Sequence, residues 1–124
     1  MQRESIRRGD VFRVAYVFPH EEEGTEKQRP VLILETDEDN QNLHYPLVQA
    51  APITTQKTSR IYAQDVMLPA GEANLPRTSK ILLGLTQPFL KIRLGQKVGH
   101  ISFSKMREVD IKLLRLFGFV AKRP

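Results

Sequence analysis

The chain has 124 residues, 40% of them hydrophobic and 27% charged, with a net charge of +5, as is typical of a globular protein with one core. It contains no cysteine, which excludes disulfides, thiolate metal sites and cysteine nucleophiles. Its apolar runs are too short to cross a bilayer, and residues 1–5 lack the apolar stretch of a signal peptide. We therefore expect a single domain over residues 1–124, located in the cytoplasm.

The pattern of apolar residues predicts a series of β-strands that are joined by turns or polar loops, with no helix between them. Residues 7–10 form a turn before the first strand, and residues 37–40 form another turn. The expected strands are 11–18, 31–36, 43–48 with a continuation towards 52–56, 61–68, 80–85, 89–93 and 96–101. Consecutive strands with short connections pair antiparallel, so we predict a mainly β fold, a curled antiparallel sheet of small-barrel type.

Three strands carry further information. Phe12, Val14, Tyr16 and Phe18 alternate along the first strand, so aromatic side chains should pack on one side of the sheet. The strand at 31–36 is apolar on both faces and should therefore be central. Pro52 argues for a bend or an edge in the third strand, because proline has no amide donor.

The C-terminal segment predicts an α-helix. Ser102 is a suitable N-cap and Gly118 a suitable stop. Apolar residues recur between them at helical spacing, namely Phe103, Met106, Val109, Leu113, Leu114 and Phe117.

The sequence around Arg29 offers the clearest candidate chemistry. Pro30 has a fixed φ and suits the first residue of a strand, which holds Arg29 in extended backbone. The polar loop at 19–29 precedes it, and the length of that loop between two strands suggests a function. A guanidinium at the start of a buried strand can bind an anion. The alternative is that Arg29 pairs with a neighbouring carboxylate.

Charge is distributed unevenly along the chain. Residues 1–75 have eight Lys or Arg against twelve Asp or Glu, a net charge of −4, whereas residues 76–124 have eleven against two, a net charge of +9. A basic half of this kind suits nucleic acid or an acidic protein partner, although solvated basic faces are also common.

Other common chemistries lack their signatures. His20, His44 and His100 stand at no recognised ligand spacing, so no metal site is expected. Gly95 and Gly99 lie between short strands without a nucleotide-fold helix, so no nucleotide cofactor is expected. A serine triad lacks its elbow motif.

Metal-free RNA cleavage fits the residues that remain. The 2′-hydroxyl of RNA is the nucleophile, so an enzyme need only move protons and stabilise a charged phosphorane. The Arg29 fork matches phosphate geometry, and the Thr54 hydroxyl can bond the same oxygens. Taken alone, a threonine at this place is more often a strand-end hydroxyl bonded to backbone. His20 could act as an acid or base, although it stands in a glutamate-rich loop where a histidine is usually solvated.

A series of short motifs spans nearly the whole chain. They are Arg8-Gly9-Asp10-Val11, Gly24-Thr25-Glu26, Arg29-Pro30, Pro52-Ile53-Thr54, Gln87, Arg93-Leu94, Gly99 before the helix, and Leu116-Phe117-Gly118-Phe119. In this order they resemble the MazF/PemK family of toxin endoribonucleases.

The resemblance implies a compact SH3-like barrel with a C-terminal helix, usually a homodimer, that cuts single-stranded RNA, including mRNA, without a metal or cofactor. The products would be a 2′,3′-cyclic phosphate and a 5′-hydroxyl. It also implies a toxin–antitoxin system, in which an antitoxin lays an acidic, partly disordered tail across the RNA groove. The basic second half of the chain suits either ligand.

By the same resemblance, Arg29 matches the catalytic arginine, for general acid work or phosphorane stabilisation. Thr54 matches the threonine that works beside it, and Glu26 an acidic loop residue that orients the arginine. The residues assigned to RNA binding are Thr25, Lys27, Gln28, Thr55, Gln56 and Gln87.

The chain also departs from the family pattern. Thr86 and Gly84 stand where many members have an aspartate or a nearby arginine, and the glutamates of the 19–29 loop would repel phosphate. Two alternatives therefore stay open: a barrel of the same fold that binds RNA or protein without cutting it, and a gyrase-directed toxin. The Arg29-Pro30 and Pro52-Ile53-Thr54 motifs argue against the gyrase-directed toxin.

Overall fold

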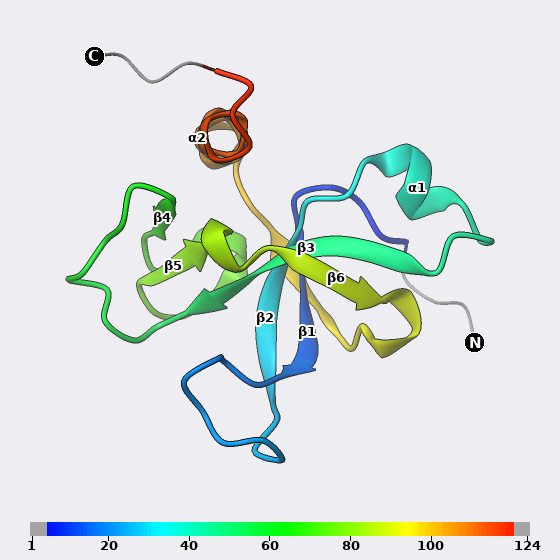
Figure 1. The fold of residues 1–124 in the computed structure, drawn as a ribbon, viewed down its shortest axis with the longest axis horizontal. Coiled ribbons are helices and arrows are strands. Elements are labelled where there is room, and N and C mark those ends of the chain that lie inside the picture. The colour runs from blue at the N-terminus through cyan, green and yellow to red at the C-terminus, as the bar shows by residue number, and fades with distance from the viewer. Residues whose placement is uncertain (1–4, 121–124) are drawn as a thin grey trace.

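The computed structural model describes residues 5–120, which form a curled antiparallel sheet with an α-helix packed against it (Figure 1). The strands are β1 (Asp10–Tyr16), β2 (Lys27–Ile33), β3 (Leu47–Thr54), β4 (Asp65–Leu68), β5 (Ser79–Leu82), β6 (Gln87–Leu90) and β7 (Lys97–His100). The helices are α1 (Asp37–Gln41), α2 (Phe103–Leu116) and three single 3₁₀ turns, η1 (Glu72–Asn74), η2 (Leu83–Leu85) and η3 (Lys91–Arg93). This confirms the predicted mainly β fold with a C-terminal helix.

The strand order is β4-β5-β3-β2-β1-β7, and β6 pairs with β3 off this path. One edge of β3 is shared: residues 47–50 pair with β6, and residues 53–54 pair with β5. Pro52 lies where β3 changes partner, a position that requires no amide donor on that edge. The central place of β2 is thus confirmed, and Pro52 marks a change of strand partner within β3, which is not an edge strand.

The two faces of the sheet build two clusters of buried side chains. The helix-side core includes Val11, Leu32, Ile53, Ile81 and Val109, which lie between the sheet and α2. The aromatic core lies on the other face and includes Phe12, Val14, Tyr16, Phe18, Val31 and Val48. Alternation along each strand separates the two sets, as predicted for 11–18. The Tyr16 ring meets the Phe18 and Phe89 rings edge to face, with centroids 5.0 and 5.9 Å apart.

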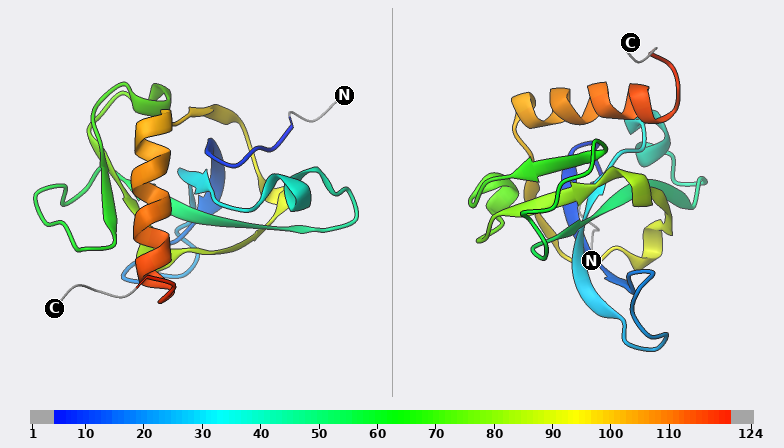
Figure 2. Two further views of the ribbon diagram at one scale, coloured as in Figure 1. Left: turned by 90° about the horizontal axis from the view of Figure 1, so that it is seen from above. Right: turned by 60° about the vertical axis from the view of Figure 1, so that its left-hand side comes forward.

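Helix α2 begins and ends as predicted, but only some of its apolar residues pack against the sheet. The Ser102 hydroxyl accepts a hydrogen bond from the Lys105 amide, and Gly118 takes a φ of 80° just after the helix. The packed residues are Met106, Val109, Leu113 and Leu116. Phe103, Leu114 and Phe117 share the predicted helical spacing but are exposed. The helix crosses the sheet on one side only (Figure 2), so residues flanking the packed ones face away from the sheet.

Strand β2 begins at Lys27 instead of residue 31, so Arg29 and Pro30 lie inside the strand. Arg29 is opposite Val14, and Pro30 is opposite Arg13. The amide and carbonyl of Arg13 bond to Gln96 and Gly95, so that position requires no donor from Pro30.

Other boundaries also differ from the prediction. Residues 37–41 form α1 instead of a turn, because the Thr36 hydroxyl caps the Glu38 amide. Residues 43–46 lie outside β3, and 55–64 form a loop that shortens the expected strand 61–68 to β4. Within residues 5–120, no helix has the length and apolar character needed to cross a membrane.

Candidate active site

Arg29, Thr54 and Lys80 lie in a row across three neighbouring strands. The pairing of β2 with β3 ends at Val31 and Pro52, and Arg29 and Thr54 each stand two residues further along their strands, on the same face as these two residues. Thr54 is in turn opposite Lys80 of β5. The intervening residues Ile53 and Ile81 belong to the helix-side core. Because successive side chains alternate, the row faces away from α2.

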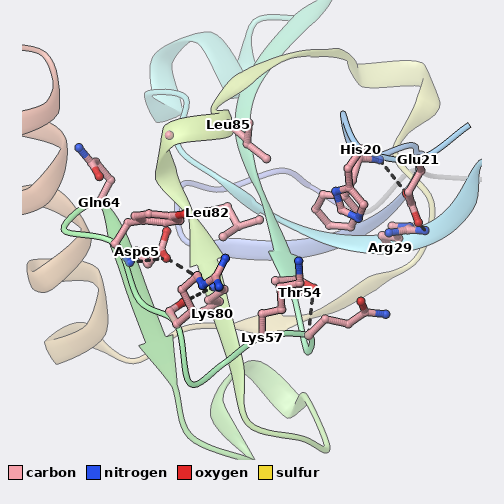
Figure 3. Close-up of a pocket in the computed structure, with 15 residues that line it drawn as sticks. His20, Glu21, Arg29, Thr54, Lys57, Gln64, Asp65, Lys80, Leu82 and Leu85 are labelled. Carbon is pink, nitrogen blue, oxygen red and sulfur yellow. Dashed lines mark hydrogen bonds and ion pairs between the residues drawn. The ribbon is translucent and has the colours of Figure 1, made fainter.

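The row opens into a pocket of about 410 Å³. Its walls come from the segment between β1 and β2, from the 55–64 loop, and from β5 with η2. Figure 3 shows His20, Glu21 and Arg29 together on one side, Asp65 and Lys80 on the other, and Thr54 between them. The volume lies within the range of about 300–1,000 Å³ that is usual for small-ligand sites.

The Arg29 guanidinium is held by a carboxylate and an aromatic ring. Its Nη2 lies 2.8 Å from Glu21 Oε2, and its Cζ lies 4.6 Å from the centroid of the Phe18 ring. The Nε is buried and has no hydrogen-bond partner among the described residues. The expectation that Arg29 pairs with a neighbouring carboxylate is therefore met. The same geometry presents a fixed cation with a spare donor to an oxyanion.

Glu21 is the carboxylate that contacts Arg29, whereas the sequence pointed to Glu26. Its Oε1 accepts the Phe18 amide at 2.8 Å, and the Glu21 amide donates to the Phe18 carbonyl. This turn holds Glu21 beside Arg29, while Glu26 is exposed and forms no ion pair with Arg29. The hydrogen bonds from Phe18 and then from Arg29 lower the pKa of Glu21, so its carboxylate is charged at neutral pH.

Thr54 and His20 also face the pocket. The Thr54 hydroxyl accepts the Gln56 amide at 3.1 Å, as expected of a strand-end threonine, and this leaves its hydrogen for a ligand. The His20 ring is stacked on Phe18, with centroids 5.8 Å apart and planes at 20°. His20 is therefore a pocket residue beside Arg29, in addition to being partly solvated.

The other predicted RNA-binding residues are dispersed. Gln56 lines the pocket. Thr25, Lys27, Gln28 and Thr55 are exposed outside it, and the Thr25 hydroxyl donates to the Glu22 carbonyl.

Gln87 faces inward. Its Nε2 donates to the Tyr16 hydroxyl at 3.1 Å and to the Leu85 carbonyl at 3.0 Å. Thr86, the departure from the family pattern, bonds the Leu83 carbonyl at 2.7 Å and closes η2. Both residues therefore support the pocket wall near Leu85 without lining the pocket.

Sequence reasoning missed the opposite wall of the pocket, which includes Lys57, Arg60, Tyr62, Asp65 and Lys80. No local motif marks these residues. Lys80 comes to Thr54 only through strand register, a pairing of residues distant in sequence. Across residues 5–120, no three metal-ligating side chains cluster closely enough to hold an ion.

Comparison with known proteins identifies the family. A family model described as "PemK-like, MazF-like toxin of type II toxin-antitoxin system" matches residues 7–117. The chain belongs to this family. Its predicted membership is thereby confirmed.

The curated relatives of this PemK/MazF-like chain include endoribonuclease MazF2 of Mycobacterium bovis and endoribonuclease MazF6 of Mycobacterium tuberculosis. Each is 34% identical over 90 residues, which cover 73% of this chain and 78% of the relative. These homologues are named endoribonucleases, which supports an endoribonuclease here.

Solved structures of MazF toxins share the fold. A mycobacterial endoribonuclease in complex with its cognate antitoxin superposes with a TM-score of 0.74 at 20% identity, covering 94% of this chain and 99% of that one. The Mycobacterium tuberculosis toxin MazF-mt6 superposes with a TM-score of 0.67 at 27% identity, covering 86% and 95%.

Proposed function

We propose that this PemK/MazF-like chain is a sequence-preferring endoribonuclease that cuts single-stranded RNA, including mRNA, without a metal ion. The products carry 2′,3′-cyclic phosphate and 5′-hydroxyl ends. The observation that carries the proposal is the placement of Arg29 and Thr54 on one face of adjacent strands, both open to one pocket. The endoribonuclease names of its relatives support it.

In this reaction the 2′-hydroxyl attacks the adjacent phosphorus, and the bond from phosphorus to the 5′ oxygen breaks. Negative charge develops on the non-bridging oxygens. Arg29, already held on Phe18, donates hydrogen bonds to these oxygens, and the Thr54 hydroxyl donates another. Because a guanidinium stays protonated in proteins, we assign Arg29 to charge stabilisation and not to proton transfer.

His20 is the candidate for proton transfer, because its imidazole lines the same pocket and histidine exchanges protons readily near neutral pH. It takes the proton of the 2′-hydroxyl or supplies one to the 5′ oxygen, and solvent water makes the other transfer, so that the 5′ oxygen leaves as a hydroxyl. Glu21 is less suited to accept a proton, because its pKa is lowered by the Phe18 amide and by Arg29.

Glu21 occupies the position on Arg29 that a phosphate oxygen needs. Binding of RNA therefore exchanges one anion for another: the phosphate takes Nη2, and the carboxylate moves aside with the loop before β2. The buried Nε supplies a second donor to the phosphate.

The test is cleavage of a long mixed-sequence RNA in excess EDTA, with mapping of the product ends. Discrete cuts with 5′-hydroxyl ends are expected from the wild type. Arg29→Ala should cut about 100- to 1,000-fold more slowly, the usual effect of removing one oxyanion donor. Arg77→Ala is the matched control, because Arg77 is exposed outside the pocket.

Each contrary outcome has a distinct meaning. Full activity in Arg29→Ala would overturn the assigned mechanism. RNA that is bound but left intact by the folded wild type would indicate a binding barrel. Inhibition in a gyrase supercoiling assay would indicate the gyrase-directed toxin.

We also propose that the chain acts in the cytoplasm, where mRNA is translated, and that an acidic antitoxin neutralises it. One mycobacterial structural neighbour was solved with its cognate antitoxin. The pocket has four cationic side chains, Arg29, Lys57, Arg60 and Lys80, against the two acidic side chains Glu21 and Asp65. This excess of positive charge suits an acidic peptide as well as RNA.

A further inference from the structure

The pocket wall across from Glu21 is made of residues that the proposed cleavage does not use (Figure 3). Its centre is the ion pair of Lys80 and Asp65, whose Nζ and Oδ2 lie 3.6 Å apart. Only 6% and 5% of these two side chains are exposed. Burying an ion pair costs desolvation free energy unless the pair has further hydrogen-bond partners, so a buried pair at a pocket suggests a role for it there.

The pair fixes the 55–64 loop that covers this side. Lys80 Nζ donates to the Arg60 carbonyl at 2.5 Å, and the Tyr62 amide donates to Asp65 Oδ2 at 2.9 Å. From α2, Lys112 Nζ donates to the Asp65 carbonyl at 2.6 Å. The wall is therefore built before any ligand arrives.

Lys80 retains a donor for a ligand. An ammonium has three N–H groups; the Arg60 carbonyl takes one, and Asp65 at 3.6 Å is an ion-pair partner beyond hydrogen-bond length. Lys80 lines the pocket, and 6% of its side chain is exposed, so its remaining donor capacity stands at the pocket wall.

The row of Arg29, Thr54 and Lys80 sets the distance from Lys80 to the reaction centre. Lys80 lies one strand beyond Thr54, and neighbouring strands are about 4.8 Å apart. A nucleotide whose phosphate contacts Arg29 and Thr54 can therefore extend its sugar and base along the row. The outer edge of that base then meets Lys80.

We infer that this wall is a nucleobase subsite selecting uracil or guanine beside the cut phosphate, with Lys80 as the specificity-determining residue; the inference rests on the proposed function. Uracil and guanine carry a carbonyl oxygen on the outer base edge, whereas cytosine and adenine carry an amino group there. A donor-only ammonium bonds the carbonyl and opposes the amino group. Tyr62 lines the same pocket and is 61% exposed, so its ring offers a stacking surface for the base.

Binding of deoxyuridine and deoxycytidine oligonucleotides of equal length, measured by fluorescence anisotropy, tests the inference. The two bases differ at the outer carbonyl or amino group, and neither oligonucleotide has the 2′-hydroxyl needed for cleavage. The wild type should prefer deoxyuridine about tenfold. Lys80→Met should bind the two equally. Equal binding by the wild type, or an unchanged preference in the variant, would overturn the inference.

Lys80→Met leaves the Asp65 carboxylate buried without its partner, which destabilises the fold; the double variant Lys80→Met/Asp65→Asn removes that charge. Circular dichroism checks both folds.

A second set of variants tests the stacking role of Tyr62. Tyr62→Ala should weaken binding of both oligonucleotides about fivefold or more, whereas Tyr62→Phe should not. Phe103→Ala is the control, because Phe103 is an exposed aromatic residue on α2. A Tyr62→Ala result equal to this control would contradict the stacking role.

Cut-site mapping separates this inference from the proposed function. If the wild type cleaves, uracil or guanine should be enriched at one position beside the cut, and the double variant should lose that enrichment. A deoxyuridine preference that depends on Lys80 in a protein that cuts no RNA would support the subsite and overturn the nuclease. Cleavage with no such enrichment would support the nuclease and overturn the subsite.

Discussion

Arg29 is oriented before any substrate binds. Its side chain is 15% exposed and lies against Phe18 with Glu21 on Nη2, so little rotamer freedom remains to be lost. The pKa of Glu21 is lowered first by the Phe18 amide and then by Arg29, which means that these two contacts stabilise the fold at pH values above the ordinary pKa of a glutamate. The contribution is lost as the pH falls through the lowered pKa. At neutral pH the carboxylate is therefore a charged competitor of phosphate.

The substitution Glu21→Gln should make this competition weaker. The new amide side chain would keep an oxygen for the Phe18 amide but lose the charge that holds Arg29, so the KM for RNA should fall about two- to fivefold, the scale of an exposed ion pair. Steady-state cleavage of a short RNA measures it. Glu22→Gln is the control, because Glu22 is exposed and makes no ion pair with Arg29. A KM equal to that of the control would contradict the competition.

Strand β3 positions the reactive side chains. It pairs with β6 before Pro52 and with β5 after it. Its first part therefore contributes to the aromatic core, and its last residue, Thr54, lines the pocket. Thr54 stands at its end, opposite Lys80 of β5 and two residues beyond the last pair with β2, Val31 and Pro52. The change of partner is thus what brings Arg29 and Lys80 to opposite sides of one hydroxyl.

Strand β7 depends on close packing at Gly99. A Cβ at this position would lie 2.5 Å from the Ala73 carbonyl oxygen and 2.8 Å from its carbon, both backbone atoms of η1. Gly99→Ala should therefore destabilise the protein by about 1–3 kcal/mol, measured by urea unfolding. Gly84→Ala is the matched control, because a Cβ there meets nothing within 4 Å. Equal unfolding midpoints for the two variants would refute the packing argument.

The distribution of charge over the molecule differs from its distribution along the chain. Residues 76–124 have a net charge of +9, yet three of the four pocket cations, Arg29, Lys57 and Arg60, come from the acidic first part. Several later cations are engaged elsewhere; Lys105, for example, pairs with Glu108 on α2. Folding therefore concentrates positive charge at the pocket in a way that the sequence totals do not indicate.

A homodimer is expected because the pocket of one barrel is short compared with a strand of RNA, and a second copy extends the binding surface. Light scattering at micromolar concentration should give about twice the 14.2 kDa mass of one chain. If the dimer is reversible, the measured mass should fall towards that of one chain when the protein is diluted to nanomolar concentration. A mass of one chain at micromolar concentration would count against the homodimer.

The sequence by itself determined the fold class, the family and the elements whose signals are local. Alternation placed Phe12, Tyr16 and Phe18 on one face, capping fixed the ends of α2 at Ser102 and Gly118, and the missing amide of Pro52 marked the point where β3 changes partner. Each of these depends on a residue's own backbone preferences or on neighbours within one element. Arg29 and Thr54 were selected as candidates from their side-chain chemistry and from the resemblance to the MazF/PemK family, and their catalytic roles stay predictions.

Only the tertiary structure decided which side chains meet. It placed Glu21 on Arg29 and left Glu26 exposed, and it turned Gln87 towards Tyr16. It also set Lys80 opposite Thr54. The physical reason is that loop folding and strand register are settled by burial over the whole core. A shift of one residue would exchange the faces of a strand, and no local pattern specifies which distant residue lies opposite.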